Sequence, residues 1–247
     1  MPLKINVGGV WKDAIPWVKV GGVWKELDVG WVFVGEDSPR IYYEKKKAPF
    51  SFTSMTEGVN QTYIIPPGRY TGLRVRVQGA GGGGGGPSGS LGGSGGGGGA
   101  AAEKTFVLTP ADVGKTITYS VGRHGNASGE NEAGGWGLNS VVRAVSPIGG
   151  YTWTVTAGGG GPGYPGNGAA GPGGTASMTG GTLDASNPGG DGTVGVGATG
   201  GAAGLAGHRA LGWFGTSPVG DGGQGHNSPI TAANAGVVGY VELYFFN

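Results

Sequence analysis

Short segments in which apolar and polar residues alternate predict a β-rich chain. Residues 73–77 alternate aliphatic and basic side chains, which is typical of a strand with one buried face. The closing residues 237–246 are too apolar for a solvated terminus and indicate a strand locked into a sheet. No segment has convincing helical periodicity, so we expect essentially no α-helix. The other segments that read as strands are 42–43, 50–52, 63–65, 105–109, 116–121 and 151–155.

The first 40 residues contain an internal repeat rich in valine, tryptophan and glycine. Residues 7–13 (VGGVWKD) recur as residues 20–26 (VGGVWKE), and each copy is followed by a further Trp-Val pair. A third, decayed unit is consistent with residues 34–36. So short a segment cannot bury several indoles, and exposed tryptophan is enriched at interfaces. We favour an interface over packing on the strands of 41–77, with these candidate attachment residues: Val10, Trp11, Trp17, Val23, Trp24 and Trp31.

Glycine dominates the rest of the chain. There are 62 glycines in 247 residues, nearly all after residue 77 and grouped in short blocks such as 81–86 and 95–99. Glycine loses more backbone entropy on folding than any other residue, and this composition alone is typical of disorder. Against disorder stand 7 tryptophans, 9 tyrosines, 7 phenylalanines and a net charge of only +1. The blocks therefore indicate backbone packed directly against backbone.

Consecutive glycines gain little from an α-helix or an ordinary sheet, because they have no side chains to bury. An extended left-handed helix with three residues per turn instead leaves every backbone N–H and C=O free to bond a neighbouring rod. We therefore expect a polyglycine II helix bundle of about ten rods. The blocks that supply them are 78–86, 95–101, 121–125, 134–137, 157–161, 166–174, 189–192, 197–204, 220–225 and 231–236.

Rods joined end to end place alternate connections at opposite ends of the bundle. Connections 102–120, 138–156, 175–188 and 205–219, with the C-terminal strand, carry the apolar β-rich segments and are expected to form a packed base with short strands. Connections 87–94, 123–133, 162–167, 193–197 and 226–231 are short and polar, and are expected to form an exposed tip. The candidate binding residues there are Pro87, Ser88, Ser90, Leu91, Arg123, His124, Asn126, Glu130, Asn131, Tyr164, Asn167, Thr193, Val194, His226 and Asn227.

Composition argues against several kinds of chemistry. The near-neutral charge gives no electrostatic case for nucleic acid, and the absence of cysteine fits assembly in a reducing cytoplasm. The histidines His124, His208 and His226 are isolated, so we expect no metal site, no cofactor and no enzyme activity. Glycine patterns like those of nucleotide-binding loops arise here by composition alone. We find no secretory signal and no run of about 18 apolar residues that would span a membrane.

Several motifs together resemble the tail-fibre tip adhesins of T-even-type bacteriophages. They are the N-terminal VGGVWK repeats, the run 77–81 (VQGAG) into polyglycine, and LTP at 108–110 ahead of ITYSVG at 117–122. The GGDG at 189–192 and the closing GYVE at 239–242 complete the set, and the resemblance covers the whole chain. Loop sequences differ freely among members of this family, so no receptor contact carries over residue by residue.

The resemblance implies a fold, partners and a location. It implies an N-terminal region, 1–77, that caps the trimeric distal subunit of the long tail fibre, with a repeat that could meet three identical subunits. It implies a glycine-rich domain, 78–247, whose tip binds a porin-like bacterial outer-membrane protein, with lipopolysaccharide also possible. The protein would be made in the host cytoplasm, be monomeric by itself and reside at the fibre tip of the virion.

Two other classes of protein remain open on the residues alone. A glycine-rich structural or ice-binding protein would also use rods, but the sequence has no regular threonine or alanine face and the tryptophan repeats would be unexplained. A glycine-rich RNA-binding protein would need Arg-Gly-Gly repeats or aromatic-basic motifs, and no Arg-Gly-Gly occurs. We therefore expect a receptor-binding adhesin.

Overall fold

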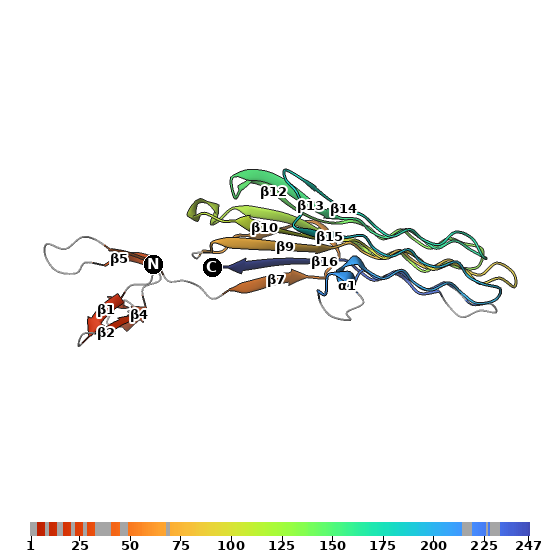
Figure 1. Cartoon of the computed structure of the whole chain (residues 1–247), viewed down its shortest axis with the longest axis horizontal. Helices are drawn as coiled ribbons and strands as arrows, with labels where there is room; N and C mark the ends of the chain where they lie inside the picture. The colour runs from red at the N-terminus through yellow and green to blue at the C-terminus, as the bar shows by residue number, and fades with distance from the viewer. Residues whose placement is uncertain are drawn as a thin grey trace.

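A computed structural model shows a β-rich protein with almost no helix (Figure 1). It describes residues 4–7, 10–13, 17–20, 23–26, 29–32, 41–44, 49–67, 70–213, 219–225, 227 and 233–247. Within them the one α-helix is the short α1 (Gly207–Ala210), and a single 3-10 turn, η1, covers Pro110–Asp112. The expectation of a mostly β chain with essentially no α-helix is confirmed.

Two five-stranded antiparallel sheets face each other as a sandwich. The first sheet has the order β15-β10-β9-β16-β7 and the second has the order β14-β13-β12-β11-β8. The strands of the first sheet are β7 (Phe50–Ser54), β9 (Gly72–Gln78), β10 (Ala101–Val107), β15 (Ala185–Asn187) and β16 (Tyr240–Phe246). Those of the second are β8 (Gly58–Ile64), β11 (Thr116–Val121), β12 (Ser140–Ile148), β13 (Tyr151–Ala157) and β14 (Ala176–Thr179).

The core lies between the sheets, as the period-2 pattern requires. In β9 the aliphatic residues point inward and are fully buried, while Arg74 and Arg76 point outward. The largest buried side chain is Trp153 of β13, whose ring stacks on Phe106 of the first sheet with centroids 4.0 Å apart. A second aromatic cluster gathers around Phe245 of β16, whose ring lies 5.0 Å from that of Phe50. Apolar area buried between the sheets is thus the main stabilising contribution in this half of the molecule.

Outside the core, the first sheet carries a compensated row of charges. Arg76 donates from Nε to Glu103 at 2.6 Å, and its Nη1 lies 3.5 Å from Glu242 on the other neighbouring strand. The Arg76 guanidinium also lies over the ring of Trp213, which follows α1. Opposite charges on adjacent strands stabilise the register of a sheet.

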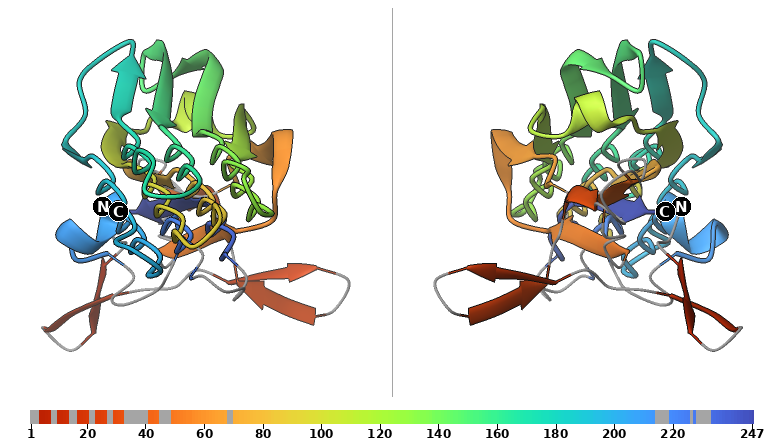
Figure 2. Two further views of the ribbon diagram at one scale, coloured as in Figure 1. Left: turned by 90° about the vertical axis from the view of Figure 1, so that its right-hand side faces the viewer. Right: turned by 90° about the vertical axis from the view of Figure 1, so that its left-hand side faces the viewer.

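The glycine-rich segments extend from one end of the sandwich (Figure 1) and, seen end on, cluster in front of the two sheets (Figure 2). They are neither β-strand nor α-helix, and backbone hydrogen bonds join them. Segment 79–86 shows how these hydrogen bonds are arranged. Successive N–H groups donate to three different neighbouring segments, and every third N–H donates to the same one. Residues 79, 82 and 85 donate to segment 94–100, residues 80, 83 and 86 to segment 132–138, and residues 81 and 84 to segment 234–237.

The same segment also accepts hydrogen bonds from three further neighbours. Carbonyls of residues 80, 83 and 86 accept from the N–H groups of residues 160, 163 and 166, while Gly81 and Gly82 accept from Gly125 and Gly223. Six segments therefore surround it, and these contacts are made by backbone, with side-chain hydrogen bonds added from Gln78 to the Gly79 carbonyl and from Ser128 to the Gly84 carbonyl. A Cβ built on Gly82 would overlap the carbonyl oxygen of Gly161, and one on Gly83 would overlap that of Asn126. Only glycine allows this approach.

The N-terminal repeat forms antiparallel hairpins. Strand β1 (Lys4–Val7) pairs with β2 (Val10–Asp13), and β3 (Trp17–Val20) pairs with β4 (Val23–Glu26) in the equivalent register. A third pair joins β5 (Val29–Val32) to β6 (Ile41–Glu44). The decayed unit expected at 34–36 lies outside the described residues.

The expected strands are present, but the expected division at residue 77 does not separate two folding units. It falls inside β9, and strands from both sides of it share the two sheets. Strands β12, β14 and β15 and helix α1 were not expected from the sequence. Of these, β12 contains Pro147 and a register irregularity between Ala144 and Ile148, which hides its alternation.

Candidate functional site

Connections between the glycine segments leave the bundle at two different ends (Figure 1). At one end they enter the sandwich through β10–β11, β12–β13, β14–β15, α1 and β16. At the other end four of them are short turns around residues 87–91, 127–132, 165–168 and 196–199, and the fifth is described there only at Asn227. Two of these turns close through single bridges, Ser88 to Leu91 and Val196 to Thr199, with Gly89 and Gly197 at positive φ. Glycine adopts that conformation without the steric cost of a Cβ.

Hydrogen bonds link these turns into one continuous surface. Asn131 N–H donates to the carbonyl of Pro87 at 2.8 Å, and Gly166 N–H donates to the carbonyl of Gly86 at 3.2 Å. Three turns therefore meet at the end of segment 79–86. On the other side of the 87–91 turn, Gly92 N–H donates to the carbonyl of Gly197 at 2.7 Å.

The fifth connection joins this surface through a side chain. Asn227 Oδ1 accepts from Gly200 N–H at 2.6 Å, directly after the 196–199 turn. Residues from the described part of all five connections therefore make up the tip. His226, a candidate binding residue, lies outside the described residues.

The tip presents apolar and acidic side chains. Leu91, Tyr164, Val194 and Val196 are all exposed, Val196 most of all at 78%. The charged side chains of the described turns are Glu130 and Glu132, and Glu132 accepts at Oε2 from Gly129 N–H. Exposed apolar groups gathered beside polar ones are typical of a surface that contacts another molecule.

Most of the candidate binding residues lie at this tip, in or beside its turns. They are Pro87, Ser88, Ser90, Leu91, Glu130, Asn131, Tyr164, Asn167, Val194 and Asn227. Thr193 lies just below them within a glycine segment, where its carbonyl accepts from Gly95 N–H and its Oγ1 accepts from Ala202 N–H. Val196 and Glu132 were not expected as binding residues, although Glu132 directly follows Asn131 and Val196 lies two positions after Val194.

Arg123, His124 and Asn126 are not part of the tip. Segment 122–126 runs straight on from β11, so Arg123 and His124 lie beside the sandwich. The Arg123 carbonyl accepts from Leu138 N–H, and His124 Nδ1 lies 2.7 Å from Oε1 of Glu57, before β8. Asn126 is a member of the segment, since its carbonyl accepts from Gly135 N–H. Their polar side chains made the segment look like a loop, whereas its backbone continues the bundle.

The candidate attachment residues all lie in the N-terminal hairpins. Trp11 and Trp24 occupy equivalent positions, opposite Asn6 and Lys19 in their respective hairpins, and Trp31 lies opposite Tyr42 in the third. Val10 and Val23 begin β2 and β4, and Trp17 begins β3. Each of the three hairpins therefore has a tryptophan whose cross-strand partner is a polar or aromatic residue.

Among the described residues no group of histidine, cysteine, aspartate and glutamate side chains could hold a metal ion. No helix in that part of the chain is long and apolar enough to cross a membrane. No protein-family model matches the chain, and no curated protein matches it.

Proposed function

We propose that this protein is a bacteriophage tail-fibre adhesin. It caps the distal end of a trimeric long tail fibre and binds an outer-membrane receptor of the host bacterium through the tip of its glycine-rich half. The observation that carries this proposal is the tip surface, in which five connections joined by hydrogen bonds gather exposed Leu91, Tyr164 and Val196 at one end of an elongated scaffold. Rigid scaffolds that present loops of this kind serve recognition.

The scaffold is proposed to be a polyglycine II bundle. Its support is the periodicity of the donors in segment 79–86, where every third N–H bonds the same neighbour, and the ring of six neighbours around that segment. A rod with three residues per turn presents its backbone groups in three directions, which accounts for this pattern. Hydrogen bonds between rods then hold each loop at a fixed distance from the next.

The opposite end of the molecule is proposed to hold the fibre. Strand β7 begins at Phe50, which pairs with Phe245 near the end of β16, and β16 runs away from the glycine segments. The chain from the hairpins therefore enters the sandwich at the end remote from the tip. Attachment there leaves the tip pointing outward, and three tryptophan-bearing hairpins suit a partner made of three identical subunits.

Substitutions at the tip are expected to abolish receptor binding without affecting folding. Tyr164→Ala and Val196→Asp should each lower binding to outer membranes of a susceptible host at least about tenfold, because apolar anchors dominate interface energy. Leu205→Ala, an exposed residue on the flank of the bundle, is the matched control and should bind like wild type. Binding is measured on membranes from a panel of bacteria, on the same membranes after protease treatment, and on purified lipopolysaccharide.

Loss of binding after protease treatment identifies a protein receptor, and retained binding with capture by lipopolysaccharide identifies the glycolipid. Tip variants that bind as wild type while Leu205→Ala does not would contradict the assignment of the tip. Unchanged thermal unfolding midpoints of all three variants are required for the comparison.

Removal of two tryptophans is expected to separate the protein from its fibre. The double variant Trp11→Ala/Trp24→Ala should no longer co-purify with the trimeric distal fibre subunit, since tryptophan is the residue that most often carries interface energy. Its binding to host membranes should stay at the wild-type level, because the tip is at the other end. Co-purification at wild-type yield would rule out these two residues as the attachment site.

A further inference from the structure

The outer face of the second sheet carries one unusual residue. Across its five strands, β8, β11, β12, β13 and β14, the only charged side chain is Arg143 of β12. Its cross-strand neighbours on that face are Thr118 and Thr154, and no acidic group pairs with it among the described residues. On the first sheet, by contrast, Arg76 has two glutamates. A cation without a counter-ion in a row of hydroxyls is a candidate for binding a ligand.

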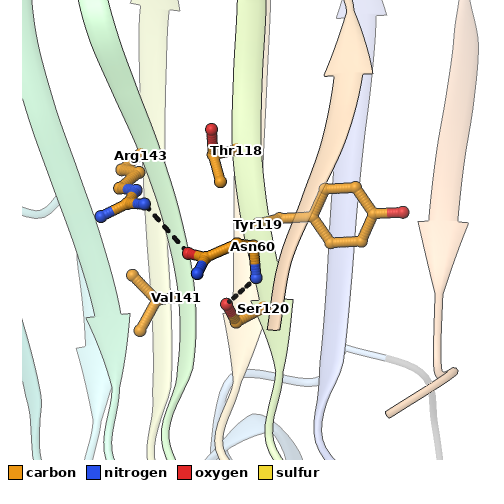
Figure 3. Close-up of a pocket in the computed structure, with 6 residues that line it drawn as sticks. All are labelled: Asn60, Thr118, Tyr119, Ser120, Val141 and Arg143. Atoms are coloured by element: carbon orange, nitrogen blue, oxygen red, sulfur yellow. Dashed lines mark hydrogen bonds between the residues drawn. The ribbon is translucent and has the colours of Figure 1, made fainter. Parts of the chain in front are cut away.

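Arg143 lies at the rim of a pocket of about 200 Å³ that opens to solvent. Side chains from three strands line it (Figure 3). Asn60 comes from β8, Thr118 and Ser120 from β11, and Val141 and Arg143 from β12. Tyr119 contributes backbone, since its ring points away into the core. The space is of the order of one monosaccharide.

The pocket is built by an irregularity in the sheet. The pairing of β11 with β8 shifts register between Tyr119 and Val121, and Asn60 opposite this point has a φ of 52°. Asparagine is among the few residues that tolerate this conformation. Asn60 N–H then donates to Ser120 Oγ at 3.0 Å, and the Asn60 side chain turns towards Arg143 (Figure 3). The bulge thus aims a side chain across the face, as bulges commonly do at binding sites.

The pocket presents hydrogen-bond donors. Arg143 Nη2 donates to Asn60 Oδ1 at 2.9 Å, which leaves the Asn60 amide N–H₂ directed elsewhere and the other guanidinium N–H groups open. Because Ser120 Oγ already accepts from Asn60 N–H, the hydroxyl keeps its own proton to donate. Thr118 adds a second hydroxyl, and Val141 an aliphatic wall. A matching ligand therefore needs acceptor oxygens, a negative charge and one less polar face.

We propose that this pocket binds an acidic monosaccharide unit, with the sugar's oxyanion on Arg143 and its ring hydroxyls on Asn60, Thr118 and Ser120. A guanidinium bonds a carboxylate or a phosphate through two parallel N–H donors, so both kinds of acidic sugar share this chemistry. The site lies on the sandwich rather than at the tip. It therefore stands independently of the proposed receptor site and would give the protein a second contact with a glycan-coated surface.

Titration of the full-length protein with four probes tests the proposal. The probes are glucuronate, glucose 6-phosphate, neutral glucose and inorganic phosphate, and binding is followed by NMR shifts of residues 58–64 and 140–145. We expect one or both acidic sugars to bind in the millimolar range or tighter and at least tenfold more tightly than glucose. The stronger of the two identifies a carboxylate or a phosphate as the natural group. Binding of inorganic phosphate as tight as that of the sugars would reduce the site to an adventitious ion only and overturn the proposal.

Three variants distinguish this pocket from any other part of the surface. Arg143→Gln should weaken acidic-sugar binding at least tenfold, with an unchanged unfolding midpoint. Asn60→Gly, which keeps the positive φ and removes the side chain, should weaken it less. Thr179→Val, on edge strand β14 of the same face, is the control and should bind like wild type. Wild-type affinity in Arg143→Gln, equal affinity for glucose, or no binding of any probe would each overturn the proposal.

Discussion

Replacing Gly82 with alanine is expected to prevent the glycine-rich half from folding. A Cβ at this position would overlap the carbonyl oxygens of Gly161 and Gly160, which are backbone atoms held by their own hydrogen bonds. Gly82 N–H also donates to Gly97 at 2.9 Å, and its carbonyl accepts from Gly223. Overpacking of a rigid core costs roughly 1–3 kcal/mol and sometimes more. Here several segments would have to move apart, so we expect at least about 3 kcal/mol, a large fraction of a typical domain's stability.

Gly129→Ala provides the matched control. Only the flexible carboxylate of Glu132 lies near a Cβ built on Gly129, and its φ is not in the left-handed region. We expect the free energy of unfolding of this variant to lie within about 0.5 kcal/mol of the wild-type value, as is usual for substitutions at tolerant surface positions. Urea unfolding followed by circular dichroism compares the two. Equal midpoints for Gly82→Ala and Gly129→Ala would show that close backbone packing does not limit the structure.

Replacing Trp153 with alanine is expected to destabilise the sandwich by about 3–5 kcal/mol. Its side chain is 2% exposed and stacks on Phe106, so it joins the two sheets at the centre of the core. The cavity left behind could not collapse easily, because neighbouring Val142 and Val155 are fixed in paired strands. The expected observation is a lower unfolding midpoint with an unchanged denaturant dependence.

Trp136 offers the same substitution at the surface. It is 61% exposed on a glycine segment, and Trp136→Ala should change stability by less than about 0.5 kcal/mol. Trp153→Phe is a third informative variant, because the buried Trp153 Nε1 has no hydrogen-bond partner. Its loss removes an unsatisfied donor, so this variant should be clearly more stable than Trp153→Ala. A cost for Trp136→Ala as large as that for Trp153→Ala would contradict the placement of the core.

Alternation predicted most of the strands and the near absence of helix. The apolar positions of 73–77 and 116–121 correspond to the inward faces of β9 and β11, because the side-chain period of a strand is fixed at two. Strand β12 was missed because its irregular register interrupts that period, and the four-residue α1 is too short to have a period. The spacing of the glycine blocks assigned most connections to the correct end of the molecule. It failed at residues 123–126, where polar residues hid the continuation of a segment.

Composition was misleading where polar residues form part of a glycine segment. Arg123 and His124 read as loop residues, yet the hydrogen bond from Leu138 N–H to the Arg123 carbonyl belongs to the same network as those of the glycines. The Arg143 pocket could not be foreseen either. Asn60, Ser120 and Arg143 lie far apart in the chain, and only the register of β8, β11 and β12 brings them together.

The position of β16 in the first sheet has a consequence for biosynthesis. This strand follows every other strand of the sandwich in the chain, yet it lies between β9 and β7 and, among the described strands, is the one that pairs with β7. Until residues 240–246 leave the ribosome, β7 cannot join β9 and β10 in the first sheet. The positions in the core that Leu243 and Phe245 fill are then empty, and the side chains around them are exposed. Such long-range pairing is slow to form. The sandwich can therefore close only after translation has passed these residues. A prematurely terminated chain would leave its core exposed to the proteases and chaperones that remove defective products.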